Sequence, residues 1–328
     1  MTSGFVQVEP QRTIAFGRGA VDESLDLIGE GFTLLATERA AAAVPSVTAR
    51  AGTIVIVPAG LVEEVAAELR PLPAGRRIVA LGGGRVVDVA KALAAADGPS
   101  DLVAIPTTLS GAEMTGWHRH LLGVTPDTPH VRPTVVINDP ALSASQSPSD
   151  LAASSANAVG HAVTAVLSER SNAIASAVGA EALQRLADGW SGLEPDRDSL
   201  ALGALLAGWA MDRSGASLHH AMAQTAVRTA SLSHAQANAA LLPVTVAAFR
   251  RRRPEELDRL DSLLGLQLES LAVDLAKRAG TSGLGAIGTD GAVRAKAVEA
   301  VLRRGEIGRI SPAPDRAELD AIYLLASS

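Results

Sequence analysis

Apolar and polar residues alternate along the first part of the chain in the way expected of an α/β domain. Short apolar runs predict six strands, at Thr13–Phe16, Phe32–Ala36, Thr53–Val57, Arg77–Leu81, Leu102–Ile105 and Thr134–Ile137. Stretches with helical spacing predict helices among them, including Val21–Gly29, Leu61–Arg70 and Val86–Ala96. Strands that alternate with helices indicate a mostly parallel sheet covered on both faces, with ligands bound at the carboxyl ends of its strands.

The pattern changes near Ser147, which can cap a helix that has Pro148 at its first position and Asp150 three residues after the cap. From there onward helical periodicity dominates and strand signals are almost absent. The predicted helices are Pro148–Glu169, Ala173–Asp188, Ser199–Arg213, Ala216–Ala230, Ala235–Arg250, Pro254–Leu264, Leu266–Ala279, Gly291–Arg303 and Arg316–Ala326. We therefore predict two domains, an α/β domain over residues 1–146 and an all-α domain over residues 147–328.

The tripeptide Gly82-Gly83-Gly84 stands directly after the fourth predicted strand, and Asp88 and Lys91 follow it at helical spacing. Three glycines remove every Cβ from the turn, so that a ligand can touch backbone N–H groups. The helix N-terminus then favours an anion, most often a phosphate. The alternative is a tight strand-to-helix turn that binds nothing.

Composition narrows the function classes. With a net charge of −6 and only 2% aromatic residues among 328, the chain lacks the basic patch and the stacking platforms of a nucleic-acid binder. The absence of cysteine excludes disulfides, thiolate metal sites and a cysteine nucleophile, and fits a cytoplasmic protein. Met1–Pro10 shows no signal-peptide pattern, and the longest apolar run, Ala201–Met211, is too short to cross a bilayer.

Four of the seven histidines lie in the helical half, at His161, His219, His220 and His234. Asn157 is spaced four residues before His161, so the two share one face of a helix. Neutral imidazoles brought together near a cofactor could bind a divalent metal or donate protons. A single such histidine is more often a core residue than a ligand. Only the presence of several histidines in this half of the chain favours metal binding or proton donation.

Five strings occur in order and carry a family resemblance: GGGRVVDVAK, AIPTTLSGAEMT, SANAVGHAV, SLHHAMAQ and LSHAQANAALLP. Together they resemble the iron-containing alcohol dehydrogenase superfamily, which includes glycerol dehydrogenases and dehydroquinate synthases. The resemblance implies a Rossmann-like N-terminal domain, a helical C-terminal domain and NAD(P) bound between them. By analogy with the family, we also expect a homodimer.

Within that superfamily the chain is most similar to maleylacetate reductases, which implies a role in aromatic compound degradation. GAEMT resembles their Gly-Ser-Glu-Met-Thr, His219-His220 resembles their segment, and Asn157 stands where metal-binding relatives have Asp. By this matching the family's metal positions are Asn157, His161, His220 and His234. Three features depart from the family: Arg85 replaces Ser, Gln224 replaces a frequent His, and the rim segment GWHRHLLG is dissimilar.

The resemblance also implies the contacts to the ligands. The cofactor residues would be Gly82, Gly83, Gly84, Arg85, Asp88, Thr107, Thr108 and Thr115. Glu38 can accept hydrogen bonds from the ribose hydroxyls, which favours NAD(H) over NADP(H), although the neighbouring Arg39 could reverse this preference. The candidates for the substrate are His118, Arg119 and Gln224, because a dicarboxylate needs cations and hydrogen-bond donors. Arg228 is a further candidate for binding the substrate, and the alternative is that it is a solvated charge on the surface.

The chemistry separates three hypotheses. Hydride addition to a double bond conjugated to a ketone forms a delocalised enolate, which N–H donors at His161, His220 and His234, with Asn157, could stabilise. Reduction of a simple aldehyde forms an alkoxide, which calls for a Lewis acid. An iron- or zinc-dependent alcohol dehydrogenase is therefore the alternative, disfavoured because an amide at Asn157 is a poorer ligand than carboxylate. The third hypothesis is an inactive relative that keeps cofactor binding, suggested by Gln224 and the rim.

Overall fold

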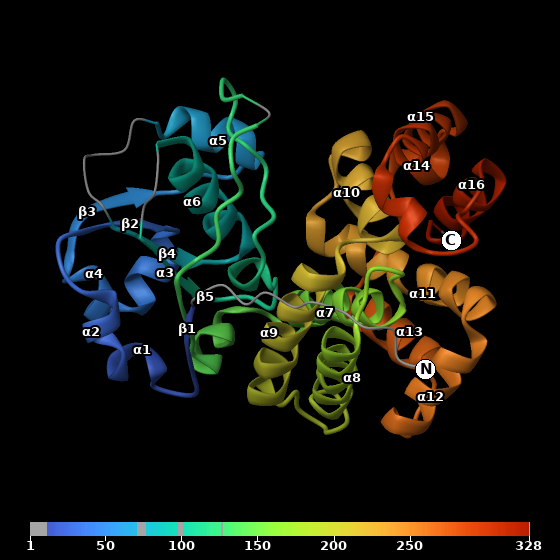
Figure 1. Cartoon of the computed structure of the whole chain (residues 1–328), viewed down its shortest axis with the longest axis horizontal. Helices are drawn as coiled ribbons and strands as arrows, with labels where there is room; N and C mark the ends of the chain where they lie inside the picture. The colour runs from blue at the N-terminus through green and yellow to red at the C-terminus, as the bar shows by residue number, and fades with distance from the viewer. Residues whose placement is uncertain (1–11, 71–76, 98–100, 126, 328) are drawn as a thin grey trace. The chain divides into compact units, whose positions relative to one another are not determined.

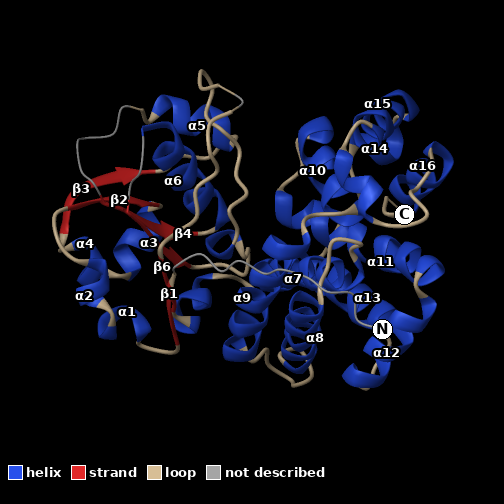
Figure 2. Cartoon of the chain, in the orientation of Figure 1, coloured by secondary structure: helices blue, strands red, loops and turns tan. Residues whose placement is uncertain are grey.

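The computed structural model describes residues 12–70, 77–97, 101–125 and 127–327. The segment Met1–Pro10, discussed above for its lack of a signal-peptide pattern, lies outside these residues. The described chain divides into two units, one formed by the residues up to Ser145 and one by Gln146 onward. In the described residues, strands occur only in the first unit, as the red arrows in Figure 2 show.

The first unit is built on one six-stranded sheet with the strand order β1-β6-β5-β4-β2-β3. Every described strand pair is parallel. The strands are β1 (Thr13–Phe16), β2 (Phe32–Ala36), β3 (Ala51–Ile56), β4 (Arg77–Gly82), β5 (Asp101–Pro106) and β6 (Val135–Asn138). All six predicted strands are present, with ends displaced by at most two residues, and the predicted α/β class is confirmed.

Alternate residues of the central strands enter two separate cores, which explains why these strands are apolar throughout. Ile78 and Ala80 of β4 pack with α5 (Val62–Glu68) and α6 (Gly84–Asp97). Val79 and Leu81 pack on the other face, in the core that includes residues of α1, α2, α3 and α4. Figure 1 shows these helices around the sheet. The bounds of the latter four are Ala20–Glu23, Leu25–Ile28, Glu38–Ala43 and Pro45–Thr48.

The helix predictions in this unit needed two corrections. The predicted helix Val21–Gly29 is two short helices, because Ser24 between them has a non-helical backbone with φ −111° and ψ 18°. Helices α3 and α4 were not predicted, since the run Ala40–Val44 offers no polar face to reveal a helical period. Their boundary signals were nonetheless present: the Thr37 side chain caps α3, and Pro45 is the first residue of α4.

The second unit is helical throughout its described elements. They are α7 (Pro148–Leu167), α8 (Ala173–Asp188), α9 (Arg197–Ser214), α10 (Leu218–Ala230), α11 (His234–Arg252), α12 (Pro254–Leu264), α13 (Leu268–Ala279), α14 (Ala286–Thr289), α15 (Gly291–Leu302), η3 (Gly305–Arg309) and α16 (Arg316–Leu325). All nine predicted helices are present, whereas α14 and the 3₁₀ helix η3 were not predicted because each is about one turn long.

Helix α7 is the centre of this unit and packs against α8, α9, α11 and α13. It starts as predicted: Ser147 Oγ accepts from the Asp150 N–H at 3.1 Å, and Pro148 is the first helical residue. Nearly every residue from Leu151 to Leu167 is buried, so α7 has no solvent-facing side. A helix that is buried all round can carry reactive groups shielded from water.

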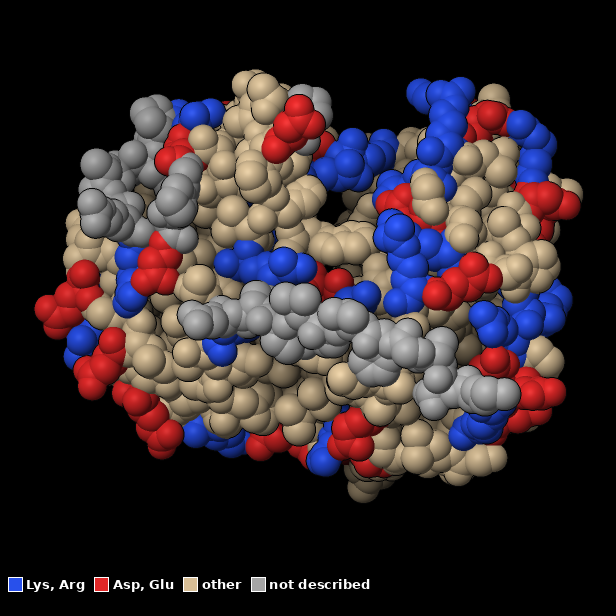
Figure 3. Space-filling view, in the orientation of Figure 1, with Lys and Arg blue, Asp and Glu red and all other residues tan. Residues whose placement is uncertain are grey.

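The four arginines Arg250–Arg253 at the end of α11 are paired with acidic side chains. Arg250 forms ion pairs with Asp258, Asp261 and Glu269, and both Arg251 and Arg252 pair with Glu318. Basic and acidic side chains are interspersed over the helical unit on the face shown in Figure 3. The cluster therefore ties α11, α12, α13 and α16 together and offers no uniform basic surface. None of the described helices has the length and hydrophobicity needed to span a membrane.

Candidate active site

The predicted cofactor residues gather at one edge of the sheet. Strand β4 pairs in parallel with both β2 and β5, so the carboxyl ends of the three strands lie side by side. Glu38 follows β2, the glycine turn ends β4, and Thr107 and Thr108 follow β5. The Thr107 N–H donates to Gly82 O at 3.0 Å, which joins the last two segments. This edge is where open parallel sheets bind ligands.

The three glycines are required by the protein's own packing. A Cβ on Gly82 would lie 2.7 Å from Val86 Cγ2, one on Gly83 would lie 3.0 Å from Thr108 Cγ2, and one on Gly84 would lie 2.9 Å from Ser110 Cβ. None of the three has a positive φ. The sequence argument that bare glycines leave room for a ligand therefore needs correction, because neighbouring side chains use part of that room. Helix α6 still begins here, with Arg85 exposed in its first turn.

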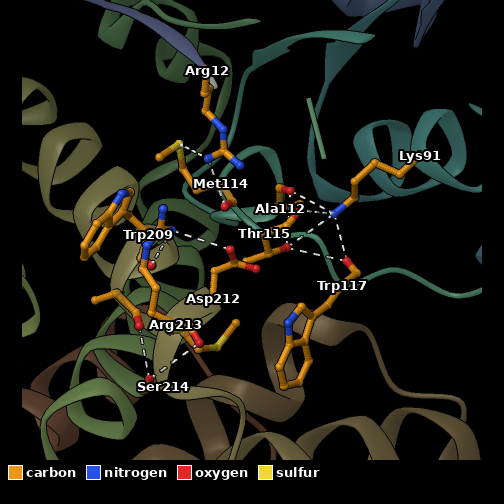
Figure 4. A network of polar contacts seen from close by, with 12 residues as sticks. Arg12, Lys91, Ala112, Met114, Thr115, Trp117, Trp209, Asp212, Arg213 and Ser214 are labelled. Atoms are coloured by element: carbon orange, nitrogen blue, oxygen red, sulfur yellow. Dashed lines mark hydrogen bonds and ion pairs between the residues drawn. The ribbon is translucent and has the colours of Figure 1, made fainter. Parts of the chain in front are cut away.

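Lys91 is fully buried and supports the segment that follows β5 (Figure 4). Its Nζ donates to Ala112 O at 2.9 Å, to Thr115 O at 3.2 Å and to Trp117 O at 2.8 Å. It also lies 2.7 Å from Asp88 Oδ1 and 3.3 Å from Thr115 Oγ1. Asp88 and Thr115, expected at the cofactor, thus have Lys91 as their described partner. Both therefore help to support the turn, and their contact with the cofactor stays a prediction.

Glu38 and Arg39 bear on the choice of dinucleotide. Glu38 is exposed at the first position of α3, just beyond the end of β2. The Arg39 guanidinium donates from Nη1 to Ser145 O at 3.1 Å. This arginine, which could have favoured a 2′-phosphate, is therefore bonded to the backbone, while the carboxylate stays exposed.

Glu113 is a buried carboxyl beside the same turn, with 1% exposure. Burial raises its pKa to about 7, although its own backbone, Lys91 and Arg12 act in the opposite direction. Between pH 4.5 and 7 the folded state holds this proton more tightly than the unfolded chain does. Stability should therefore fall as pH rises through that window and level off above it.

We expect Glu113→Gln to remove this decline, because the amide does not ionise. From pH 5 to pH 8 the unfolding free energy of the variant should rise relative to that of wild type by about 2 to 3 kcal/mol, at 1.36 kcal/mol per pKa unit. Urea unfolding at the two pH values measures it, with the exposed Glu64→Gln as control. A difference that does not change with pH would show that Glu113 ionises normally.

His118 and Arg119 lie in the segment 116–132, between the 3₁₀ helix η1 (Ala112–Met114) and β6. The Val131 N–H donates to His118 Nε2 at 3.1 Å, which makes Nδ1 the protonated nitrogen, 3.0 Å from Arg119 O. Burial lowers the pKa of His118 to about 4, so the ring is neutral. Its only N–H is thus donated to backbone, which corrects the expected role of His118 as a donor to a substrate carboxylate. The Arg119 side chain is exposed.

In the helical unit, two of the predicted histidines meet. His161 on α7 and His220 on α10 stack with their ring centroids 4.5 Å apart and an interplanar angle of 23°. Both are at least 95% buried, and Asn157 lies one turn before His161, also buried. His161 Nδ1 and both ring nitrogens of His220 are buried and have no hydrogen-bond partner among the described residues. Buried polar atoms in this state call for a partner, which can be water, a ligand or an ion.

His219, next in sequence to His220, is a structural residue. Its Nδ1 lies 2.9 Å from Thr245 Oγ1 and its Nε2 lies 3.0 Å from Asn238 Oδ1, so it fastens α10 to α11. Gly160 on α7 permits this, since a Cβ there would lie 2.4 Å from His219 Cδ2. The glycine before His161 thus sets how closely α10 approaches α7, and thereby where His220 lies.

His234 is placed less closely than predicted. It is the first residue of α11, exposed, and its carbonyl accepts from Asn238 Nδ2 at 2.7 Å. Its charge still acts on His161, His219 and His220, lowering the pKa of each. The described cluster is therefore a stacked pair, with His234 at its solvent side.

Burial keeps these imidazoles neutral. Desolvation, followed by repulsion from neighbouring histidines, lowers the pKa of His161 to about 3 and that of His220 well below its usual value. At neutral pH each ring can donate one N–H or offer a lone pair, but it cannot act as an imidazolium acid.

Arg304 is a site residue that sequence reasoning missed. Its Nη2 donates to Gln224 Oε1 at 2.6 Å and to Glu306 Oε1 at 2.6 Å, and its charge lowers the pKa of His220. Its Nε is buried without a hydrogen-bond partner. Gln224 lies one turn after His220 on α10, so this departure from the family holds an arginine near the histidine pair. Arginine carries most of the basic charge here, and no local pattern distinguishes this one.

The comparisons with known proteins agree with this architecture. Residues 151–282, which include α10, α11 and all but the first three residues of α7, match the model of the Fe-containing alcohol dehydrogenase family, C-terminal. The maleylacetate reductase of Sphingobium indicum is 31% identical over 316 residues, which are 88% of this chain and 88% of that protein. This chain belongs to the iron-containing alcohol dehydrogenase family. It is an NAD(P)H-dependent oxidoreductase of that family.

Two further members show how far the likeness extends. The maleylacetate reductase of Rhizobium sp. is 33% identical over 225 residues, 65% of this chain and 64% of that protein, so that alignment spans less than two thirds of the relative. The solved maleylacetate reductase from Agrobacterium tumefaciens matches 99% of this chain and 98% of its own, with a TM-score of 0.81 and 25% identity.

The donor types match the metal after which the family is named, although the ligand atoms of His161, His220 and His234 do not all lie within 4.8 Å of one another. Two neutral imidazoles with unpartnered ring nitrogens, a third histidine at the solvent side and an amide oxygen are ligands that Zn²⁺ or Fe²⁺ accepts. Asn157, His161, His220 and His234 would hold the ion. The amide in place of a carboxylate removes one negative charge from the set, which lowers its affinity for a dication.

Proposed function

We propose that this chain reduces maleylacetate, or a closely related unsaturated keto acid, with NADH. The observation that carries the proposal is the buried, neutral pair His161 and His220 with Arg304 held nearby. Such a group suits a substrate that has both a polarisable ketone and a carboxylate. The relatives named maleylacetate reductase support the substrate class.

The two units have separate roles in this proposal. Residues 1–146 form the dinucleotide-binding domain, with the pyrophosphate at the start of α6 near Gly83, Gly84 and Arg85, and with Thr107 and Thr108 at the next strand end. Exposed Glu38 binds the ribose hydroxyls, and the backbone contact of Arg39 supports NADH over NADPH. Residues 147–328 form the catalytic domain.

The reaction balances without an imidazolium acid. A bound NADH would supply a hydride to the alkene carbon β to the ketone, and the alkene electron pair would shift to make an enolate. Neutral N–H groups of His161 and His220 donate to the enolate oxygen. Because both rings have a lowered pKa, water supplies the proton that completes the α-carbon. The products are the saturated keto acid, NAD⁺ and a hydroxide ion, which the solvent neutralises.

Arg304 binds a substrate carboxylate in this proposal. A guanidinium grips a carboxylate with charge-assisted hydrogen bonds, and its other contacts, Gln224 and Glu306, orient it. Gln224 thus affects the substrate only by orienting Arg304. A protonated histidine at the same position could not accept a hydrogen bond from the Arg304 guanidinium. This replaces the sequence-based expectation that His118 and Arg119 hold the carboxylates.

The unpartnered ring nitrogens favour one other function, a metal-dependent alcohol or aldehyde dehydrogenase. A bound divalent ion would supply Lewis-acid polarisation of the carbonyl oxygen. Removal of metal with a chelator, followed by assays with maleylacetate and with simple aldehydes, separates the two. Aldehyde turnover that is lost with the metal and restored by Fe²⁺ or Zn²⁺ would favour the alternative. Tight NADH binding with no turnover of either class would indicate an inactive relative.

We expect His220→Ala to lower kcat for maleylacetate by about tenfold or more, the usual scale for losing a positioned proton donor. NADH affinity should stay nearly unchanged, because the cofactor residues lie in the other unit. Stopped-flow NADH oxidation and fluorescence titration measure the two quantities. Arg259→Ala, at an exposed position on α12, is the control. Unchanged kcat would remove His220 from the mechanism.

We also propose that the enzyme works as a cytoplasmic homodimer on a small-molecule substrate. The family resemblance supports the dimer, and the use of a reduced nicotinamide cofactor supports the cytoplasm. Light scattering of the purified chain tests the oligomeric state.

A further inference from the structure

Three histidines outside the proposed active site converge in the segment 116–132. They are His118, His120 and His130, three of the seven in the chain. One nitrogen from each lies within 4.8 Å of the other two. The ring centroids are 5.3 Å (118 to 120), 4.8 Å (118 to 130) and 4.6 Å (120 to 130) apart. Within the described part of the chain, no other three His, Asp or Glu side chains meet this condition.

His118 is oriented as a metal-binding imidazole is. Its Nδ1–H is 3.0 Å from the Arg119 carbonyl oxygen, and the remaining lone pair is on Nε2. Histidines that bind metals through one nitrogen commonly donate the other N–H to a carbonyl or carboxylate, which fixes the tautomer and the ring. A metal at Nε2 would replace the Val131 N–H as the partner of that lone pair.

Of the other two histidines, one has a buried ring nitrogen without a hydrogen-bond partner and the other is accessible to solvent. Nδ1 of His120 is buried and has no hydrogen-bond partner among the described residues. A buried ring nitrogen in that state costs free energy unless something fills its valence. His130 is exposed, so an ion can enter from solvent.

Two of the three rings, those of His118 and His130, have a lowered pKa. Burial is the main cause that lowers the pKa of His118 and His130, and repulsion within the cluster and from Lys91 adds to it. Arg132 also acts on His130. Lys91 is paired with Asp88 at 2.7 Å, which offsets its charge. Neutral imidazoles compete for metals without first losing a proton.

We propose that His118, His120 and His130 bind a divalent transition metal, with Zn²⁺ as the ion that three nitrogen donors suit best. Three imidazoles and a water complete a tetrahedral site. The rings must close by about 1 Å or more, since zinc–nitrogen bonds are about 2.0–2.1 Å long. The ion would link residues 118–120 to residue 130, across the segment that Lys91 supports. The site does not depend on the proposed reduction.

The test is metal titration of the full chain after chelation, by calorimetry with Zn²⁺ and by visible absorbance with Co²⁺. We expect His120→Ala and His130→Ala each to weaken one binding event by more than about 100-fold, beyond the effect of losing an outer-shell partner. That loss should occur whether or not a second ion binds at His161 and His220. Arg119→Ala, between two of the ligands, should bind as wild type does.

Saturating Zn²⁺ should also raise the melting temperature of wild type but not that of His130→Ala. Because the His130 side chain is exposed, its replacement should leave the fold intact, so misfolding would not account for the missing effect of zinc. Isotherms identical for wild type and both histidine variants would overturn the site. So would the absence of any binding at millimolar metal.

Discussion

Replacing Lys91 by methionine should lower the unfolding free energy of the α/β unit by about 2 to 4 kcal/mol, the scale of leaving several buried acceptors without their donor. Methionine fills the volume but leaves the carbonyls of Ala112, Thr115 and Trp117 without their donor. Asp88 loses its counter-ion at the same time. Lys91→Arg should not restore the lost stability. The three N–H donors of an ammonium point in different directions from one atom, and a planar guanidinium cannot reproduce that arrangement toward these oxygens.

Urea unfolding and hydrogen exchange of the peptides around residues 112–117 measure this effect. Lys277→Met, on the exposed face of α13, is the matched control and should change stability by less than about 0.5 kcal/mol. NADH affinity should fall with the loss of local protection, since Thr107 and Thr108 precede the supported turn. A Lys91→Met variant as stable as the control would show that the network in Figure 4 contributes little.

Replacing Arg304 by methionine should raise KM for maleylacetate by about 30- to 100-fold. A hydrogen bond to a charged group contributes about 1.5–3 kcal/mol, and each 1.4 kcal/mol is a factor of ten. The kcat should change less, because Arg304 holds the substrate and does not receive the developing charge. Gln224→Ala should raise KM more modestly, since it removes only a contact that orients the guanidinium.

The control for Arg304 is its exposed neighbour Arg303→Met, which should leave KM unchanged. An enone without a carboxylate gives a second comparison, because its KM should be the same for wild type and for Arg304→Met. If KM for both substrates rises equally, the arginine is structural and another cation binds the carboxylate. If neither substrate is turned over by wild type, the proposed reaction itself is wrong.

Much of the fold could be read from local patterns. The strand Arg77–Leu81 and the cap at Ser147 were predictable because a buried parallel strand is apolar throughout and a helix start has its own side-chain chemistry. Helices α3 and α4 escaped prediction because a run of alanines has no polar face. Their existence depends on packing against the sheet, which no local period reports.

The candidate site was predictable in its members more than in their roles. The strings around Asn157, His161 and His220 identified the family and drew attention to the residues that the structure brings together. The same reasoning assigned His118 to the substrate, whereas its only N–H belongs to the backbone. Arg304 was invisible, because its neighbours Gln224 and His220 are some 80 residues away in sequence.

By itself, the sequence determined the two-domain class, the parallel sheet and the family, since periodicity, caps and ordered motifs are properties of neighbouring residues. Only the tertiary structure decided that Lys91 is a buried support, that His161 and His220 stack while His234 stays at the surface, and that three loop histidines meet. The physical reason is that burial and contact between distant residues set which lone pairs, N–H groups and charges remain available. Those quantities depend on packing across the whole unit.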